Sequence, residues 1–170
     1  MRFIAFLFFL TLIFQNKDKG LDLNYDKAKN QTVASTAPIE VKLRDSFLTK
    51  DFDFKVQCIF EGQYPVARPE SAYLVFRALS HRWRFLEESE RQASFLIDGM
   101  RFSPSSKPNY TSVVGEKFLD ETLIYEVKIS DVERIARASN IEIQIGEVVG
   151  RLKEKQVGKI KDFLDRVSKP

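Results

Sequence analysis

The sequence predicts an α+β domain, mainly an antiparallel β-sheet or sandwich, with a short helix near 131–139 and a C-terminal helix packed on the sheet. Three patterns support this fold class. Apolar residues recur at every second position over 52–60, an Asp-Gly pair separates two apolar runs at 98–99, and the last residues are amphipathic at helical spacing. With 170 residues, of which 44% are hydrophobic, the chain is long enough to bury one core.

The N-terminus has the pattern of an export signal. Arg2 precedes an apolar run from Phe3 to Phe14, and polar residues follow from Gln15. At ~1.5 Å per residue the run reaches only about 18 Å as a helix, which is short for a bilayer core of ~30 Å. We therefore predict that residues 1–20 are a signal peptide. The residues before Gln15 are not small, so an uncleaved N-terminal anchor, with a membrane tether through residues 3–14, stays open.

Residues 21–36 follow the predicted signal peptide and are polar, with no regular spacing of apolar residues. Asp22, Asn24 and Lys27 are typical of them. Such a composition favours a linker, and it places a single β-rich domain at 37–170. The predicted location is exported, which means periplasmic, cell-envelope or secreted.

The clearest strand covers 52–60. Its inward positions at period two are occupied by Phe52, Phe54, Val56, Cys58 and Phe60. Cys58 then points into the core as a small inert hydrophobe. Residues 72–79 are apolar on nearly both faces, which indicates a central strand, and the intervening 61–69 is rich in turn residues.

A hairpin is predicted next. Asp98-Gly99 lies between the strands 93–97 and 100–102, and a type I′ turn needs positive φ at both of these residues. The polar stretch 103–116 is expected to be a loop, and strand character resumes at 122–127.

Two helices complete the domain. Ser130 and Glu133 have the spacing of a capping box at the start of the first, and Asn140 is expected to end it in a left-handed conformation. Isoleucines alternate over 141–145 before a Gly146-Glu147 turn into 148–152. The final helix presents one apolar face, made of Val157, Ile160, Phe163, Leu164 and Val167.

Residues 52–167 resemble a group of exported bacterial domains of unknown function. The resemblance rests on the segments 83–86, 95–102 and 141–146, together with Glu126, Ile135-Ala136, Ala138 and the terminal amphipathic helix. These are packing and turn signatures. The resemblance therefore implies export and the order of strands, and it implies no catalytic residues.

Composition excludes several kinds of site. Cys58 is the single cysteine, so no internal disulfide and no cysteine-rich zinc site is possible, and His81 is the single histidine. No glycine-rich phosphate loop is present. Residues 21–170 carry 24 basic and 23 acidic residues, a net charge of +1, which argues against nucleic acid as a partner. We predict no metal and no cofactor.

The densest candidate site is the segment 80–86. In an extended chain His81, Trp83 and Phe85 share one face, while Arg82 and Arg84 share the other. Trp83 and Phe85 are then expected in the core. Arg82 and Arg84 are either solvated and paired with nearby glutamates or, as the candidate ligand-binding residues, offer forked donors to a carboxylate or phosphate.

Two functions from different classes remain open. The favoured one is a non-enzymatic binding module of the cell envelope or secreted space, whose partner is an unknown protein or an anionic ligand. The alternative is a hydrolase that uses carboxylates from separate loops. Acidic residues gathered in a concave pocket would favour the enzyme, whereas a flat apolar or arginine-rich surface would favour binding.

Overall fold

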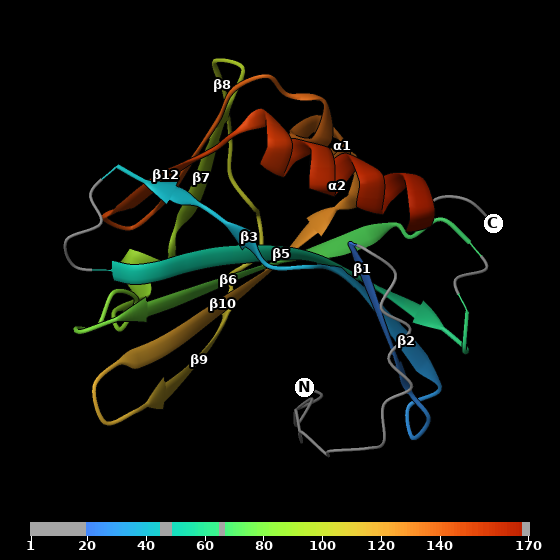
Figure 1. The fold of residues 1–170 in the computed structure, drawn as a ribbon, viewed down its shortest axis with the longest axis horizontal. Helices are drawn as coiled ribbons and strands as arrows, with labels where there is room; N and C mark the ends of the chain where they lie inside the picture. The colour runs from blue at the N-terminus through green and yellow to red at the C-terminus, as the bar shows by residue number, and fades with distance from the viewer. Residues whose placement is uncertain (1–19, 45–48, 65–66, 168–170) are drawn as a thin grey trace.

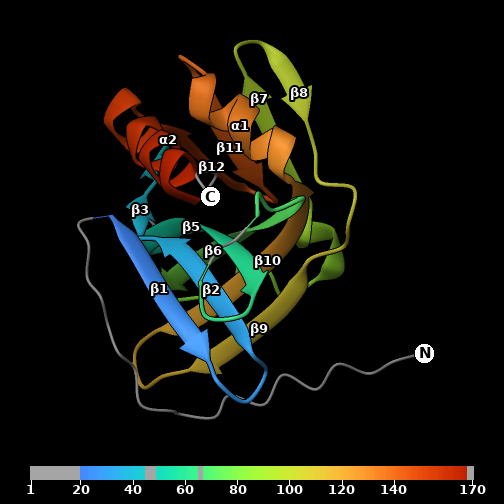
Figure 2. The ribbon, with the colours of Figure 1, turned by 90° about the vertical axis from the view of Figure 1, so that its right-hand side faces the viewer.

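The computed structural model describes residues 20–44, 49–64 and 67–167. The predicted signal or anchor before Gly20 lies outside these residues. Within the described ranges, two antiparallel β-sheets and two α-helices surround a common core (Figures 1 and 2). The elements are β1 (Leu21–Asp26), β2 (Gln31–Thr36), β3 (Ile39–Glu40), β4 (Lys42–Leu43), β5 (Thr49–Glu61), β6 (Ser71–Ser80), η1 (Glu88–Arg91), β7 (Ala93–Ile97), β8 (Met100–Phe102), β9 (Asn109–Val114), β10 (Leu119–Lys128), α1 (Ile129–Arg137), β11 (Ile141–Ile145), β12 (Val148–Leu152) and α2 (Glu154–Val167).

The larger sheet has the strand order β1-β2-β5-β6-β10-β9, and β3 pairs with β5 beside this path. The long strands β5, β6 and β10 form its centre, as Figure 1 shows. The predicted alternation in β5 is confirmed, because Phe52, Phe54, Val56, Cys58 and Phe60 are all buried. The predicted central position of 72–79 is confirmed as well, since β6 lies between β5 and β10.

The smaller sheet has the order β4-β12-β11-β7-β8. Its inner face is apolar because alternate residues of β11 and β7 are isoleucine, phenylalanine or alanine. The predicted turn between β7 and β8 is confirmed: φ is +47° at Asp98 and +84° at Gly99. The carboxylate of Asp98 also accepts the backbone N–H groups of Ser139 and Asn140, which ties this hairpin to the start of β11.

Both helices pack on each other above the larger sheet (Figure 2). The predicted apolar face of α2 is confirmed, since Val157, Ile160, Phe163, Leu164 and Val167 are buried. The fold is therefore of the predicted α+β class, with its C-terminal helix packed on sheet. Among the described residues, no helix has the length and apolar composition needed to cross a membrane.

The predicted ends of α1 are wrong. The helix begins at Ile129, and no side chain caps it, so Ser130 is not the N-cap. Glu133 instead lies beside Arg68 and Arg137 in ion pairs. Asn140 does not take positive φ, because the helix has already ended at Ala138 in an extended conformation.

The predicted linker 21–36 is a β-hairpin of the larger sheet, which corrects the expected domain start at 37. The buried side chains of β2 include Thr32, Ala34 and Thr36, which are polar or small, and this hid the strand in the sequence. Thr32 is buried because its hydroxyl donates to the carbonyl of Gly62 at 2.7 Å. Thr36 is buried because its hydroxyl accepts the N–H of Val56 at 3.1 Å. Both threonines thus lie in the core with satisfied hydroxyl groups.

The predicted loop 103–116 is also wrong in part. Residues 109–114 form β9, which pairs with β10 and has no second neighbour within the described sheet. As an edge strand it is largely exposed, and its sequence Asn-Tyr-Thr-Ser-Val-Val lacks the apolar alternation of a half-buried strand.

Candidate functional site

The segment 81–86 does not continue the preceding strand, so the predicted alternation of its side chains is wrong. β6 ends at Ser80, whose hydroxyl donates to the carbonyl of Arg82 at 2.7 Å and turns the chain. After this turn Phe85 is fully buried as predicted, but Trp83 is 36% exposed. Arg82 is exposed, whereas Arg84 is only 9% exposed. Arg82 and Arg84 therefore do not share a solvent face, and Arg82 alone of the two lies open to a ligand.

A buried carboxylate explains this turn. Glu121 on β10 is 0% exposed and accepts three hydrogen bonds. The backbone N–H groups of Arg84 and Phe85 donate at 2.8 and 2.9 Å, and the hydroxyl of Tyr110 donates at 3.0 Å. Burial of a carboxylate is tolerated only when such donors replace water. Glu121 thus fixes the backbone of 84–85 against the sheet.

Arg91 holds the other side of the same segment. Its Nε donates to the carbonyl of Phe85 at 2.7 Å, and its guanidinium also donates to the carbonyl of Leu86. The guanidinium carbon lies 3.9 Å from the ring centroid of Tyr110, a cation–π contact. The hydroxyl of Tyr125 donates to the carbonyl of Arg91 at 2.6 Å. The polar groups in these contacts bond to one another within the protein. We call Glu121, Arg91, Tyr110 and Tyr125, which hold the segment 84–86 through them, the clamp.

A basic face lies elsewhere, on the outer surface of the smaller sheet. Strand pairing places five residues in one row across it, each directly opposite the next: Lys42, Arg151, Glu142, Leu96 and Arg101. At ~4.8 Å between neighbouring strands the row is about 19 Å long. Arg44 lies beside this row, because its backbone N–H donates to the carbonyl of Val149 on β12 at 2.8 Å, and its side chain adds a further cation. We call Lys42, Arg44, Arg101 and Arg151, with Glu142, the basic face.

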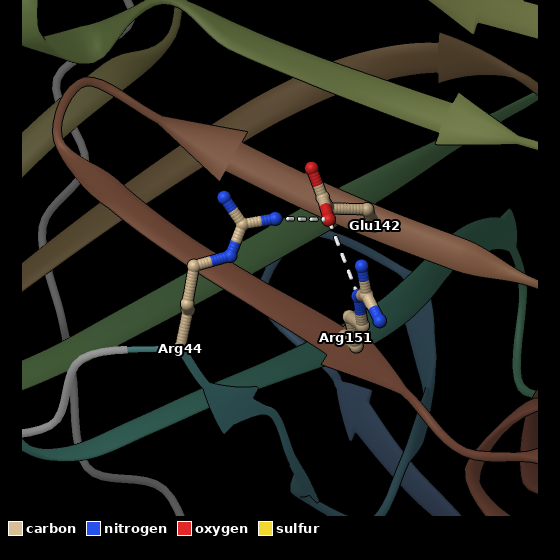
Figure 3. Close-up of polar contacts among 3 residues, drawn as sticks. All are labelled: Arg44, Glu142 and Arg151. Atoms are coloured by element: carbon tan, nitrogen blue, oxygen red, sulfur yellow. Dashed lines mark hydrogen bonds and ion pairs between the residues drawn. The ribbon is translucent and has the colours of Figure 1, made fainter.

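Two arginines of this face share one carboxylate oxygen (Figure 3). An amino group of Arg44 lies 2.7 Å from Oε2 of Glu142, and Nε of Arg151 lies 3.2 Å from the same atom. Both arginine side chains are 63% exposed, and Glu142 is 23% exposed. Each guanidinium carries five N–H donors, so most of this donor capacity is not used by Glu142. The basic face has four cations and one anion, and it is open to solvent.

Acidic residues gather on the outer face of the larger sheet. Asp51, Asp53, Arg77 and Leu79 line a hollow of about 60 Å³. Arg77 makes a bidentate ion pair with Asp120, in which the guanidinium nitrogens lie 2.6 to 3.0 Å from the carboxylate oxygens. Burial, and then the nearby charge of Asp51, raises the pKa of Asp53. A hollow of this size holds about two waters at ~30 Å³ each. It is therefore too small for a substrate.

A wider hollow of about 510 Å³ lies where the loop after β8 passes the end of β10. Glu126, Lys128 and Asp131 line it, together with Ser103, Ser105 and Ser106. The hydroxyl of Ser106 donates to the carbonyl of Glu126 at 2.9 Å. This is the concave region of suitable size for the predicted carboxylate chemistry.

No group of three or more His, Cys, Asp or Glu side chains within the described residues has the arrangement of a metal site. His81 is exposed; its ring contacts Phe118, and its Nδ1 lies 3.2 Å from the carbonyl oxygen of Lys117. Cys58 is buried, and burial raises the pKa of its thiol to about 12, which removes it as a nucleophile near neutral pH.

Comparison with known proteins returns no relative. No protein-family model, curated protein or solved structure matches the chain.

Sequence reasoning missed both the clamp and the basic face. Glu121 could have been found from phase, because it occupies an inward position of β10 between Leu119 and Leu123. Outward Glu142 was visible in the isoleucine alternation of 141–145. Its partners Arg44 and Arg151 come from segments about 100 residues apart in the sequence, and local patterns do not reveal that pairing.

Proposed function

We propose that this protein is a non-enzymatic binding module that recognises an anionic partner through the basic face. The observation that carries the proposal is the shared oxygen of Glu142, which engages both Arg44 and Arg151 while their guanidinium groups stay exposed. An exposed ion pair is worth only ~0–1 kcal/mol, so a carboxylate, sulfate or phosphate group on a partner can replace Glu142 at small cost. Arginine suits these anions because its forked N–H donors bind two oxygen atoms of a carboxylate, sulfate or phosphate group at once.

Charge segregation supports this surface. Residues 21–170 carry a net charge of only +1, yet four cations and one carboxylate gather on one side of the smaller sheet. The rest of this stretch is therefore slightly acidic. Such an asymmetric distribution steers an anionic partner toward one face. Leu96 lies between Glu142 and Arg101 in the row, is 39% exposed and adds apolar contact area.

The proposal places the module in the cell envelope or secreted space. This part rests on the sequence alone, through the basic residue and the apolar run before Gln15. Export would separate the basic face from intracellular nucleic acid, which leaves anionic polysaccharides, lipid headgroups or acidic proteins as partners.

Binding to heparin, used as a sulfated probe, tests the proposal. The double variant Arg44→Gln with Arg151→Gln should bind at least about tenfold more weakly at low salt, which corresponds to ~1.4 kcal/mol. The matched control is Arg68→Gln with Arg137→Gln, because these two arginines likewise flank one glutamate, Glu133, on α1. The control removes the same charge and should change the affinity less than about twofold.

A third variant gives the opposite sign. Glu142→Gln should strengthen heparin binding, because it removes the internal anion that competes for both arginines. Equal losses in the two double variants would reduce the effect to net charge and overturn the proposal. Weaker binding of Glu142→Gln would also contradict it, because the arginines would then act through the integrity of the sheet.

One observation favours the alternative hydrolase: Glu126 and Asp131 border the hollow of about 510 Å³ beside the serines of the loop after β8. Hydrolysis of a chromogenic ester or glycoside by the full chain, lost in both Glu126→Gln and Asp131→Asn, would support this second function. Activity that survives both replacements would exclude these carboxylates from it.

A further inference from the structure

The sheet edges within the described residues differ in how they are protected. β1 carries Asp22 and Asp26, and β4 and β8 span only two and three residues and carry Lys42 and Arg101. Charges and short length are the usual means by which edge strands avoid pairing with other chains. β9 has six residues and contains neither a charged residue nor a proline.

β9 also exposes the two most accessible apolar side chains found among the described large hydrophobic residues, Val113 at 67% and Val114 at 69%. Both lie next to backbone that has no partner on the outer side within the described sheet. A strand that adds to this edge would cover these valines and satisfy the outer backbone groups.

The hydrogen-bond phase of β9 identifies which groups face outward. The N–H of Gly115 donates to the carbonyl of Phe118 at 2.9 Å, so this pair is a hydrogen-bonded one. Hydrogen-bonded and non-hydrogen-bonded pairs alternate along antiparallel strands. The backbone groups of Asn109, Thr111 and Val113 are therefore hydrogen-bonded to β10. Tyr110, Ser112 and Val114 alternate with them and occupy the non-hydrogen-bonded pairs with β10. The backbone N–H and C=O groups of these last three residues point away from the sheet.

We propose that β9 pairs antiparallel with β9 of a second copy of this chain, with Ser112 opposite Ser112. A two-fold axis normal to the sheet keeps residues of equal phase opposite each other. Centring on Ser112 pairs Tyr110 with Val114 of the other copy and uses all three outward residues of each strand. A shift of two residues one way would bring Pro108, which has no N–H, into the ladder.

The same register fits the side chains. Thr111 of one copy lies opposite Val113 of the other in a non-hydrogen-bonded pair, where side chains approach most closely. The six residues of β9 carry no charge, so no like-charge repulsion opposes pairing within the strand. Outside these six residues the same register sets Lys107 of one copy opposite Lys117 of the other, and Glu116 opposite Pro108, next to that lysine pair.

The area involved predicts a weak dimer. Stable interfaces bury about 800 Å² per partner, and a six-residue strand provides less than this. Association should therefore depend on concentration. It should leave the basic face accessible, because that face belongs to the other sheet.

Disulfide trapping in the full chain tests the register. Antiparallel hydrogen-bonded pairs have Cα atoms about 5.5 Å apart, within the range that a disulfide spans. Ser112→Cys should therefore give a covalent dimer on oxidation with copper phenanthroline, detected on a non-reducing gel. Ser139→Cys, an exposed cysteine distant in the sequence from β9, is the control for random collision and should stay monomeric.

Three further variants make the result specific. Thr111→Cys alone should cross-link poorly, because its counterpart is offset by two residues, whereas Thr111→Cys with Val113→Cys should cross-link well. Adding Val113→Lys to Ser112→Cys should reduce the dimer severalfold. Cross-linking of Ser112→Cys no greater than that of Ser139→Cys would overturn the proposal, and efficient dimers from Thr111→Cys alone would overturn the register. Circular dichroism of each variant verifies that the monomer is folded.

Discussion

Replacing Glu121 measures how strongly the buried clamp holds the segment 81–92. In Glu121→Gln the amide oxygen can still accept from Phe85 and Tyr110, but the amide NH₂ then faces the backbone N–H of Arg84. One buried donor is left without an acceptor, at a cost of about 1–3 kcal/mol. Glu121→Ala removes all three acceptor contacts and should cost about 3–9 kcal/mol, comparable with the whole stability of ~5–15 kcal/mol of a domain.

Urea unfolding followed by circular dichroism gives these free energies, and Trp83 fluorescence reports on the clamped segment itself. Glu126→Gln is the matched control, because it lies on the same strand with its side chain exposed, and surface changes stay within about 0.5 kcal/mol. If Glu121→Gln also falls within that range, the clamp reasoning is refuted. If Glu121→Gln and Glu126→Gln lower the free energy of unfolding by similar amounts, β10 is sensitive to any substitution and the loss does not measure the clamp.

Three further predictions concern the division of the chain and its core. Removing residues 1–19 should leave a cooperatively unfolding domain, whereas removing 1–36 should abolish it by uncovering the edge of β5; thermal melts of both truncations give the answer. Phe163→Ala should lower the free energy of unfolding by about 3–5 kcal/mol, since this ring is 1% exposed, and a loss below about 1 kcal/mol would place α2 outside the core. The thiol of Cys58, with its pKa raised by burial to about 12, should resist maleimide at pH 8 until urea unfolds the chain. Because a thiol in the unfolded chain ionises near its ordinary pKa of 9.0 and the folded one does not, stability should fall as pH rises above 9.0, and a rise there would contradict this linkage.

The parts of the fold that the sequence predicted correctly are those with a strong apolar period. β5, β11 and α2 bury one complete face each, and the β7–β8 turn requires the backbone freedom of Asp98-Gly99. Each of these signals is local. The strands β2 and β9 are a different matter. Each forms a hairpin with a strand next to it in sequence, β1 or β10, but their residues lack the apolar alternation of a half-buried strand.

The candidate site was less predictable because it depends on contacts between segments that are distant in sequence. Alternation failed at Trp83 and Arg84 because Glu121, more than 30 residues away, bonds to the backbone and turns the chain out of strand geometry. The same distance effect concealed the basic face, where Arg44 approaches Glu142 through pairing of β4 with β12. An arginine-rich surface was the expected mark of a binding module, but its location required the tertiary structure.

The pairing of β4 with β12 also bears on when the domain can form during synthesis. Lys42 lies opposite Arg151, and the side-chain amide of Gln156 donates to the carbonyl of Glu40. Contacts that link such distant positions cannot form until the later of the two segments has been synthesised, and topologies of this kind fold slowly. Until residues 148–167 leave the ribosome, the smaller sheet lacks β12, which joins β4 to β11, and the core lacks α2. The nascent polypeptide therefore cannot close its core until residues up to Val167 have left the ribosome.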